Sequence, residues 1–364
     1  MKIALIGTRG IPATYGGFET CTQEIGQRLV HRGHEVWVYC RAGHYPEKQE
    51  RYLGMNLVYI NEPRSRFLET VFHTYKSLLH ASKRDFDIFL VFNSGNAFSL
   101  LVPLIFKKKV ALHMDGMEWK REKWSTLAKS YHRCAAWLAT KLPIEMINDS
   151  RELQDYYQKK YGRDSHYITY GAPLQKSQDP SLLQGLGLEA NGYYFQLTRF
   201  EPENNPLLTV QAFQKLQTDK KLVLVGGVTY ETPYSNKIAL LQNENILLPG
   251  LVYDKDILRE LYCNCFAYIH GNEVGGTNPT LLEAMGSGCF VISRDVAFNR
   301  EVLQDAGIYF DKTQASLLEK MNWALENPDN IRLCKEKSQN IIRKAYDWEQ
   351  VTDAYERLFL KMLE

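Results

Sequence analysis

The first half of the chain alternates short apolar runs with longer stretches in which apolar residues recur at helical spacing. The short runs predict buried strands at Lys2–Ile6, His34–Cys40, Asn56–Ile60, Asp87–Phe92, Lys109–His113 and Glu145–Asn148. The longer stretches predict helices at Phe18–Arg32, Arg66–Lys83, Lys123–Thr140 and Arg151–Lys160. Strands that alternate with helices of this length are typical of a parallel sheet covered on both faces.

The pattern stops and then restarts in the second half. Residues 175–192 are rich in Gln, Ser, Asp, Gly and Pro and predict a linker. Strands are then expected at Tyr193–Leu197, Lys221–Val225, Phe266–Ile269 and Cys289–Ser293, with helices at Pro206–Gln217 and Pro279–Ser287 and a mostly helical end after Thr313. The prediction is an α/β protein of two Rossmann-like, doubly wound parallel-sheet domains, residues 1–174 and 193–345, with a last helix over 346–364 that returns to the first domain.

Composition narrows the choice of function. The 44 Lys and Arg residues nearly balance 42 Asp and Glu residues, so a net charge of +2 gives no reason to expect nucleic-acid binding. Seven scattered Cys residues lack the paired spacing of a zinc site and suggest reduced thiols in the cytoplasm. The apolar run from Ala97 to Phe106 contains Pro103 and is too short to span a bilayer.

The opening segment Gly7–Thr20 places a loop of turn-forming residues between a strand and a helix. Gly16 and Gly17 allow the backbone to approach a ligand closely, and the free amides of the helix start favour an anion. A loop without a ligand is the alternative. The spacing is not that of a dinucleotide-binding fingerprint, and Cys40-Arg41 stand where an acidic residue would follow the second strand.

A second loop of the same kind precedes the helix at Pro279. Gly276, Thr277, Asn278 and Thr280 are expected to bind a ligand there, with Asn278 as the helix N-cap. Glu283 lies about one turn into the helix, where a carboxylate accepts hydrogen bonds from a ribose diol. A solvated or capping Glu is the alternative interpretation.

Arg199 comes just after the predicted strand Tyr193–Leu197 and suits a diphosphate, which a guanidinium holds bidentately. A structural ion pair is the alternative. Two anion-binding loops, a guanidinium and a diol-binding carboxylate together indicate a nucleoside diphosphate carrying a sugar. Positive groups around the leaving diphosphate would lower the barrier to transfer. Ligands of such sheets bind outside the carboxyl ends of the strands, so a cleft between the two domains is expected.

These residues resemble glycosyltransferase family 4, a family of retaining enzymes with the GT-B fold. Pro279–Met285 matches the family signature, and Glu283 matches its ribose-binding Glu. The opening Gly-Thr-Arg-Gly-Ile-Pro-x-x-Tyr-Gly-Gly-Phe-Glu-Thr resembles a narrower bacterial subgroup that includes rhamnosyltransferases of surface polysaccharide assembly. Two positions differ from the wider family. Gly275 stands where the family has a second Glu, and Asn204 stands where it has a Lys. The resemblance places Asn204 among the donor-binding residues.

The resemblance implies dTDP-rhamnose as the leading donor, with UDP- and GDP-sugars open, and a saccharide acceptor, free or linked to polyprenyl diphosphate. It implies no cofactor and no metal, and Asp85-Phe86-Asp87 is interpreted as a strand start. Arg199, Glu283 and Asp115 are expected to carry the chemistry, with Asp115 positioning the acceptor hydroxyl. The acceptor is expected to contact His113, Asp115, Glu118 and Arg121; a plain turn is the alternative for Asp115-Gly116.

Bases and indoles gather before and after the acceptor segment. Lys107, Lys108 and Lys109 follow the apolar run, and Trp119, Lys120, Arg121, Lys123, Trp124, Lys129 and Arg133 come next. This composition suits the headgroup region of a membrane. An equal alternative is that the Trp side chains pack in the core. Two other functions stay open: a GT-B-like sugar-nucleotide epimerase, and a non-catalytic protein that binds a nucleotide sugar.

Overall fold

The computed structural model describes residues 1–13, 16–63, 68–122, 124–228 and 231–364. The chain forms two compact units. The first contains Met1–Lys120, Trp124–Tyr170 and Trp348–Glu364, and the second contains Arg121–Lys123 and Gly171–Asp347. The structure describes no helix that is long and apolar enough to cross a membrane.

The first unit is built on an eight-stranded sheet in the order β3-β4-β2-β1-β5-β6-β7-β8. The strands are β1 (Lys2–Ile6), β2 (Glu35–Arg41), β3 (Arg51–Tyr52), β4 (Met55–Ile60), β5 (Ile88–Phe92), β6 (Lys109–His113), β7 (Glu145–Asn148) and β8 (His166–Tyr167). Their pairing is parallel except between β3 and β4. The six predicted strands are confirmed. The strands β3 and β8 have two residues each, too few to produce a periodic signal.

Helices cover this sheet: α1 (Gly17–His31), α2 (Leu68–Ser82), α3 (Leu101–Ile105), α4 (Thr126–Ala139), α5 (Arg151–Tyr161) and α13 (Trp348–Leu363). Short 3₁₀ turns lie at η1 (Ala42–His44), η2 (Ser94–Leu100) and η3 (Glu118–Lys120). The predicted starts of two helices, at residues 66 and 123, lie outside the described residues. Helix α4 begins at Thr126 because the Ser125 hydroxyl accepts a hydrogen bond from the Ala128 amide.

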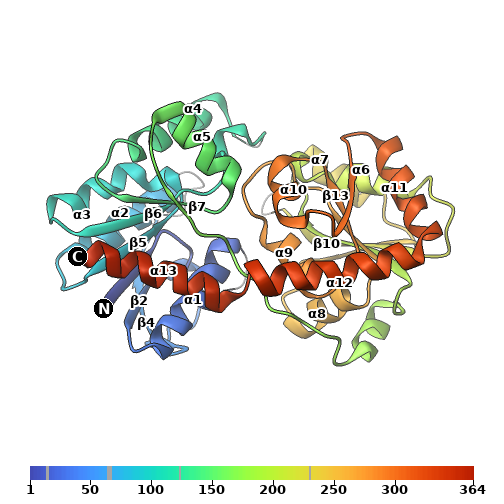
Figure 1. The fold of residues 1–364 in the computed structure, drawn as a ribbon, viewed down its shortest axis with the longest axis horizontal. Coiled ribbons are helices and arrows are strands. Elements are labelled where there is room, and N and C mark those ends of the chain that lie inside the picture. Colours follow the sequence, from blue (N-terminus) through green and yellow to red (C-terminus); the bar gives the residue numbers. More distant parts are fainter. Residues whose placement is uncertain (14–15, 64–67, 123, 229–230) are drawn as a thin grey trace. The chain divides into compact units, whose positions relative to one another are not determined.

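The C-terminal helix α13 packs against α1 within the first unit (Figure 1). Arg32 of α1 forms ion pairs with Glu349, Asp353 and Glu356 of α13, and Arg28 forms one with Glu349. Several cations and anions on facing helices form a network, which fixes α13 more firmly than an isolated surface pair would. The segment that follows Asp347 therefore groups with the first unit. A last helix that returns to the first domain was the expectation from the sequence.

The second unit has a six-stranded, wholly parallel sheet in the order β11-β10-β9-β12-β13-β14. Its strands are β9 (Tyr193–Arg199), β10 (Lys221–Gly227), β11 (Ile246–Gly250), β12 (Ala267–His270), β13 (Val291–Arg294) and β14 (Gly307–Phe310). The order reverses at β9, where the chain continues to β10 on one side and β12 pairs on the other. The edge strands β11 and β14 were not predicted, because each buries only part of its length and has an apolar run of only three residues.

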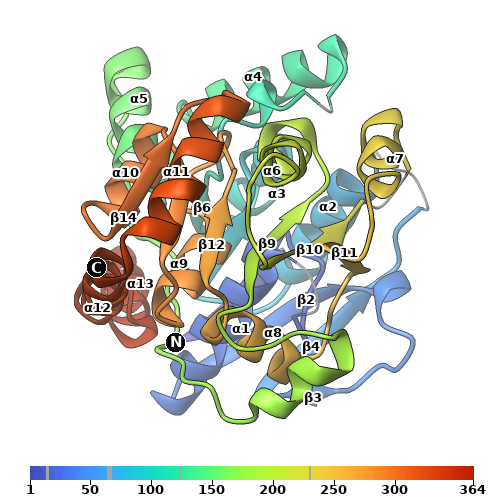
Figure 2. The same cartoon turned by 90° about the vertical axis from the view of Figure 1, so that its right-hand side faces the viewer.

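The helices of the second unit are α6 (Pro206–Phe213), α7 (Pro233–Ala239), α8 (Lys255–Cys263), α9 (Pro279–Gly286), α10 (Ala297–Leu303), α11 (Gln314–Glu326) and α12 (Pro328–Ala345). The 3₁₀ turns η4 (Pro180–Leu186) and η5 (Pro202–Asn204) complete it. Helices α6 and α11 lie side by side (Figure 2), and α12 packs against α9. The prediction of a second parallel α/β domain is confirmed.

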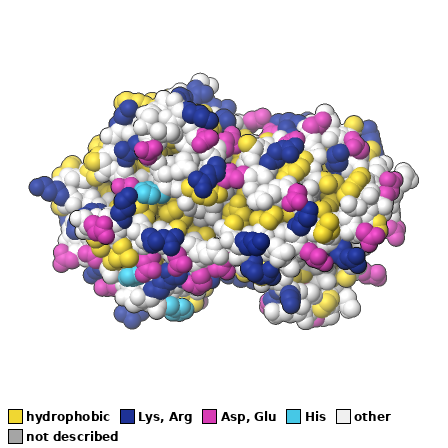
Figure 3. All heavy atoms as spheres, viewed as in Figure 1, with side chains coloured by type: hydrophobic (Ala, Val, Ile, Leu, Met, Phe, Trp, Pro, Cys, Tyr) yellow, Lys and Arg dark blue, Asp and Glu magenta, His cyan; other side chains and the backbone are white. Residues whose placement is uncertain are grey.

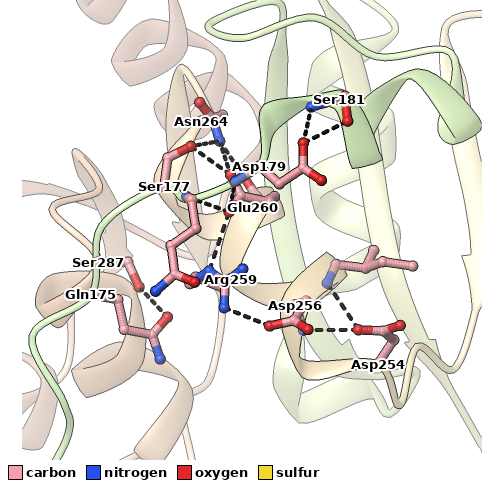
Figure 4. A network of polar contacts seen from close by, with 12 residues as sticks. Gln175, Ser177, Asp179, Ser181, Asp254, Asp256, Arg259, Glu260, Asn264 and Ser287 are labelled. Atoms are coloured by element: carbon pink, nitrogen blue, oxygen red, sulfur yellow. Dashed lines mark hydrogen bonds and ion pairs between the residues drawn. The ribbon is translucent and has the colours of Figure 1, made fainter.

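The segment predicted as a linker is instead fixed to α8 of the second unit (Figure 4). The fully buried carboxylate of Glu260 accepts hydrogen bonds from the Ser177 hydroxyl at 2.6 Å and from the amides of Gln178 and Asp179 at 2.8 and 3.1 Å. Arg259 and Asn264 also donate to it. The polar residues that suggested a linker are thus the donors that a buried carboxylate requires.

Burial alone would raise the pKa of Glu260, but these donors outweigh it and lower the pKa to about 2. The pKa of Glu260 is lower in the folded protein than in the unfolded chain, so the charged carboxylate stabilises the fold above about pH 4.5. This stabilisation is lost as the pH falls toward 2.

We expect Glu260→Ala to lower the free energy of unfolding by roughly 2–3 kcal/mol at pH 7. Urea unfolding at pH 7 and pH 3 measures this, with a smaller difference expected at pH 3. Glu319→Ala is the matched control because Glu319 lies on the same unit with its side chain 69% exposed. Equal stability of the two variants at pH 7 would contradict the role given to Glu260.

Candidate functional site

Two loops of the second unit meet at the carboxyl end of the sheet, where the strand order reverses. They follow β9 and β12, which are neighbours in the sheet. The Asn205 side chain donates to the Gly271 carbonyl at 2.8 Å, and the Glu273 amide donates to the Glu203 carbonyl at 3.0 Å. A reversal point of this kind leaves a crevice between loops in which doubly wound sheets bind ligands.

Arg199 is the last residue of β9 and lies half-buried at this edge. Its guanidinium has no hydrogen bond or ion pair with any residue that the structure describes. The structural ion pair considered from the sequence is therefore not found. A partly buried cation without a protein counter-ion favours the binding of an anion.

Asn204, predicted to contact the donor, is buried and holds the Arg199 loop together. Its amide donates to the Arg199 carbonyl at 3.0 Å, and its own carbonyl accepts from Gln196 at 3.2 Å. Only 1% of its surface is exposed. Asn204 thus shapes the backbone that carries Arg199, and its contact with the donor stays a prediction.

Helix α9 begins in the second loop. The Asn278 carboxamide oxygen accepts from the Thr280 amide at 3.2 Å and hydroxyl at 2.9 Å, which confirms Asn278 as the N-cap. The following Pro279 starts the helix without an amide to satisfy. Gly276 and Thr277 precede the cap and are buried. The remaining first-turn amides and the helix dipole make this terminus attractive to an anion.

Glu283 lies one turn into α9 and is partly buried. Burial raises the pKa of its carboxyl to about 7, against the opposing effects of a hydrogen bond from Tyr262 and the charge of Lys255. The Tyr262 hydroxyl donates to Oε2 at 3.2 Å, and no other described residue donates to this carboxylate. Glu283 therefore keeps the capacity to accept two further hydrogen bonds, as a vicinal diol supplies.

The neighbouring acidic residue, Glu273, is engaged elsewhere. Its carboxylate forms ion pairs with Arg294, at 3.4 Å, and with Lys312. At Gly275, which replaces the wider family's second Glu, a side chain would meet open space. No described carboxylate thus takes over the position at Gly275.

The opening loop of the first unit is tied to α1 by two side chains that sequence reasoning missed. Glu19 accepts from the Arg9 amide at 2.8 Å, and Gln23 accepts from the Ala13 amide at 2.9 Å. Gly16 has φ 119°, and a Cβ there would lie 2.2 Å from a Glu19 oxygen. Since the Glu19 carboxylate already lies against the first turn of α1, the N-terminus of α1 is a poorer anion site than the N-terminus of α9.

Asp115 lies at the carboxyl end of β6, beside Asn93 at the end of β5. The Asn93 amide donates to Asp115 Oδ2 at 3.3 Å, and Asp115 Oδ1 accepts from the Gly116 amide at 2.8 Å. Both residues have positive φ, 64° for Asp115 and 76° for Asn93. Strained backbone of this kind clusters at functional sites. Asn93 was missed, although an Asn directly after a buried strand was the available signal.

The other predicted acceptor residues are buried. His113 is fully buried between the rings of Phe18, Phe92 and Tyr170, and burial lowers the pKa of His113 to about 3. It is a neutral core residue rather than an acceptor ligand, because no ring atom reaches the surface.

Glu118 and Arg121 are also largely buried. Glu118 accepts from the Trp124 indole at 3.0 Å. Arg121 groups with the second unit, where it lies 4.0 Å from Glu203, so the prediction that it belongs to the first domain is wrong. Trp119 packs in the core of the first unit, which excludes it from a membrane surface.

One group among the described residues has the spacing of metal ligands: His44, Glu62 and Glu69 lie with ligand atoms within 4.8 Å of one another. Arg41 donates to Glu69, and its charge together with that of Arg9 lowers the pKa of His44 further than burial alone. These cations oppose a metal ion, so we assign none. Asp87, of the Asp-x-Asp sequence, accepts from the Lys2 amide at 2.7 Å and directly precedes β5, so the predicted strand begins one residue later than expected.

Comparison with protein families divides the chain in the same way. Residues 1–173 match a domain of unknown function (DUF1972), and residues 185–348 match the glycosyl transferases group 1 family. A search of curated protein sequences found no match.

Solved structures resemble this chain over its whole length. Alr3699/HepE from Anabaena, solved with UDP, has a TM-score of 0.79 at 16% identity and covers 99% of this chain and 100% of its own. Sucrose-phosphate synthase from Thermosynechococcus elongatus has a TM-score of 0.82 at 16% identity, covering 99% and 98%. WaaG, a glycosyltransferase involved in lipopolysaccharide biosynthesis, has 0.74 at 15% identity, covering 96% and 98%. The chain therefore has the GT-B fold, and the match of residues 185–348 to the glycosyl transferases group 1 family supports a glycosyltransferase.

Proposed function

We propose that the protein transfers a sugar, with retention of configuration, from a nucleoside-diphosphate donor to a saccharide acceptor. The observation that carries the proposal is the set of groups at the carboxyl edge of the second sheet. Arg199 has no counter-ion among the described residues, α9 presents its N-terminus, and Glu283 keeps unused acceptor capacity. A diphosphate next to a ribose diol matches these three groups.

Each group has a distinct task in this proposal. Arg199 and the first-turn amides of α9 bind the donor diphosphate, and Glu283 accepts hydrogen bonds from the ribose hydroxyls. As the bond from sugar to diphosphate breaks, negative charge grows on the leaving oxygens. Arg199 and the α9 dipole stabilise that charge more in the transition state than in the ground state, which accelerates transfer.

The acceptor belongs to the first unit in this proposal, and Asp115 positions its hydroxyl. The hydroxyl attacks the sugar on the face that the diphosphate leaves, and a donor phosphate oxygen takes the proton. This route needs neither a protein nucleophile nor a metal. The Asn93 amide supports it by fixing Asp115 at 3.3 Å, so that the hydroxyl meets a pre-oriented carboxylate.

The donor is proposed from two lines of support. The opening motif resembles rhamnosyltransferases, which favours dTDP-rhamnose, while Alr3699/HepE was solved with UDP-glucose at 16% identity. The proposed acceptor is a saccharide linked to a polyprenyl diphosphate, in bacterial surface polysaccharide synthesis on the cytoplasmic side of the membrane.

A non-catalytic nucleotide-sugar-binding protein is the second candidate, and the open position at Gly275 favours it. Glu273 does not replace the absent carboxylate, because Arg294 and Lys312 hold it. Such a protein would bind the donor without turnover.

The first test is a thermal-shift panel of dTDP-rhamnose, UDP-glucose, UDP-N-acetylglucosamine, GDP-mannose and the bare nucleotides, without added metal. We expect one nucleotide class to raise the melting temperature, because a ligand that binds only the folded state stabilises it. Product analysis of the stabilising donor with saccharide acceptors then separates transfer from binding. Stabilisation by none of these compounds would contradict the proposed donor site.

Arg199→Ala and Glu283→Gln should each lower kcat/KM by about 10²-fold, because each removes a charged contact with the donor. Glu283→Gln should also raise the free energy of unfolding at pH 8 by roughly 1–3 kcal/mol, because it removes a desolvated charge. Urea unfolding and initial rates measure both effects. Arg332→Ala, at a side chain 76% exposed, is the control. Destabilisation by Glu283→Gln would indicate a structural role instead.

Donor affinity should depend on the ionisation of Glu283. Its pKa in the free protein is about 7, and hydroxyl donors from the ribose favour the charged form and so lower the pKa when the donor binds. Affinity is therefore highest above pH 7 and falls as pH decreases, by about tenfold between pH 8 and pH 6. Calorimetric titration with a nucleotide sugar measures this, since the terminal phosphate of a bare nucleotide titrates near pH 6. Glu283→Gln should abolish the dependence; an unchanged pH profile in that variant would refute the assignment.

A further inference from the structure

The first unit carries a row of large apolar side chains on its surface. Phe98, Leu101, Ile105 and Phe106, on η2 and α3, are between 42% and 78% exposed, and we call them the α3 ridge. The spacing of 98, 101 and 105 puts three of them on one face of the helical segment. Four such residues within nine positions form a contiguous patch, which is unusual on a surface without a partner.

The ridge is not a sign of poor packing. Ala97 and Leu100 on the other face of the same segment are fully buried in the core of the first unit, and Pro103 is also buried. The segment packs against α2 and α4 on its two sides. Its buried residues therefore secure the fold, and polar side chains on the ridge would cost the fold little.

Apolar surface continues onto both neighbouring helices. On α2, Phe72 and Tyr75 are exposed. On α4, Leu127 is exposed, and Tyr131 lies 5.6 Å from Phe98 between ring centroids. Exposed apolar side chains are thus found on the ridge and on the two helices that pack against it.

Positive charge surrounds this surface. Residues 68–120 and 124–141 of this unit contain ten Lys and Arg against five Asp and Glu, whereas the whole chain has 44 and 42. Lys107–Lys109 follow the ridge directly, Lys129 and Arg133 lie on α4, and Lys76 lies 4.5 Å from the Phe72 ring. Figure 3 draws one face of the molecule, on which basic and acidic side chains are interspersed.

We propose that the α3 ridge and the bases around it dock on an anionic lipid bilayer, with the ridge side chains entering the boundary between headgroups and acyl chains. Exposed aromatic and aliphatic groups bordered by Lys and Arg match that boundary in polarity and charge. Trp119, which was expected from the sequence to contact the membrane, is buried. The α3 ridge takes that role in this proposal. Its use rests on the proposed function, because docking would bring the enzyme to a lipid-linked acceptor.

Vesicle flotation of the full-length protein tests the proposal. We expect binding to phosphatidylcholine vesicles that contain about 30 mol% phosphatidylglycerol, and at least tenfold weaker partitioning to pure phosphatidylcholine. The double variant Leu101→Gln, Ile105→Gln and the triple variant Lys107→Gln, Lys108→Gln, Lys109→Gln should each reduce binding about tenfold. Leu240→Gln is the matched control, because Leu240 is 84% exposed on the second unit, and it should bind as the unaltered protein does.

Absence of vesicle binding, or equal losses in the Leu240 control, would overturn the docking surface. A protein that dimerises in solution, and becomes monomeric in the ridge variant without a change in vesicle binding, would assign the ridge to a second copy instead. The ridge variants should keep their thermal shift with the nucleotide sugar. If no donor stabilises any variant while vesicle binding follows the ridge, the donor proposal fails and the docking surface stands.

Discussion

Parallel strands that are buried on both faces can present polar groups only at their ends, and this constraint decides where the chemistry of both units lies. The central strands β1 and β5, and β9 and β12, carry almost wholly buried side chains. Polar side chains then follow directly after the last strand residues, as Asn93 and Asp115 do in the first unit. The same edge in the second unit carries Arg199 and the start of α9.

Two buried glutamates of the second unit show how structural and functional carboxylates differ. Glu260 has donors on both oxygens, and they lower its pKa to about 2 despite burial. Glu283 has a single donor from Tyr262, and burial raises its pKa to about 7. A carboxylate left with so few donors destabilises the free protein, and a ligand that supplies hydroxyl groups relieves this cost. The difference separates a residue that holds a loop from one that awaits a ligand.

The two anion sites expected from glycine-rich loops prove unequal for a similar reason. At α9 the cap is the neutral Asn278, so the terminus keeps its positive potential. At α1 the carboxylate of Glu19 lies in the first turn and is needed to hold the opening loop through the Arg9 amide. The negative charge of Glu19 orders the opening loop but weakens the attraction of the α1 terminus for an anion. The loop before α9 is ordered without such a charge.

The sequence by itself determined the two parallel-sheet units, the N-cap at Asn278 and the position of Arg199 at the carboxyl end of a strand, because local periodicity and capping rules act over a few residues. Only the tertiary structure decided which polar residues are satisfied. It buried His113 between aromatic rings, turned Asn204 inward and joined the apparent linker to Glu260. Burial and hydrogen-bond partners come from residues far apart in the chain, and for this reason no local pattern reveals them.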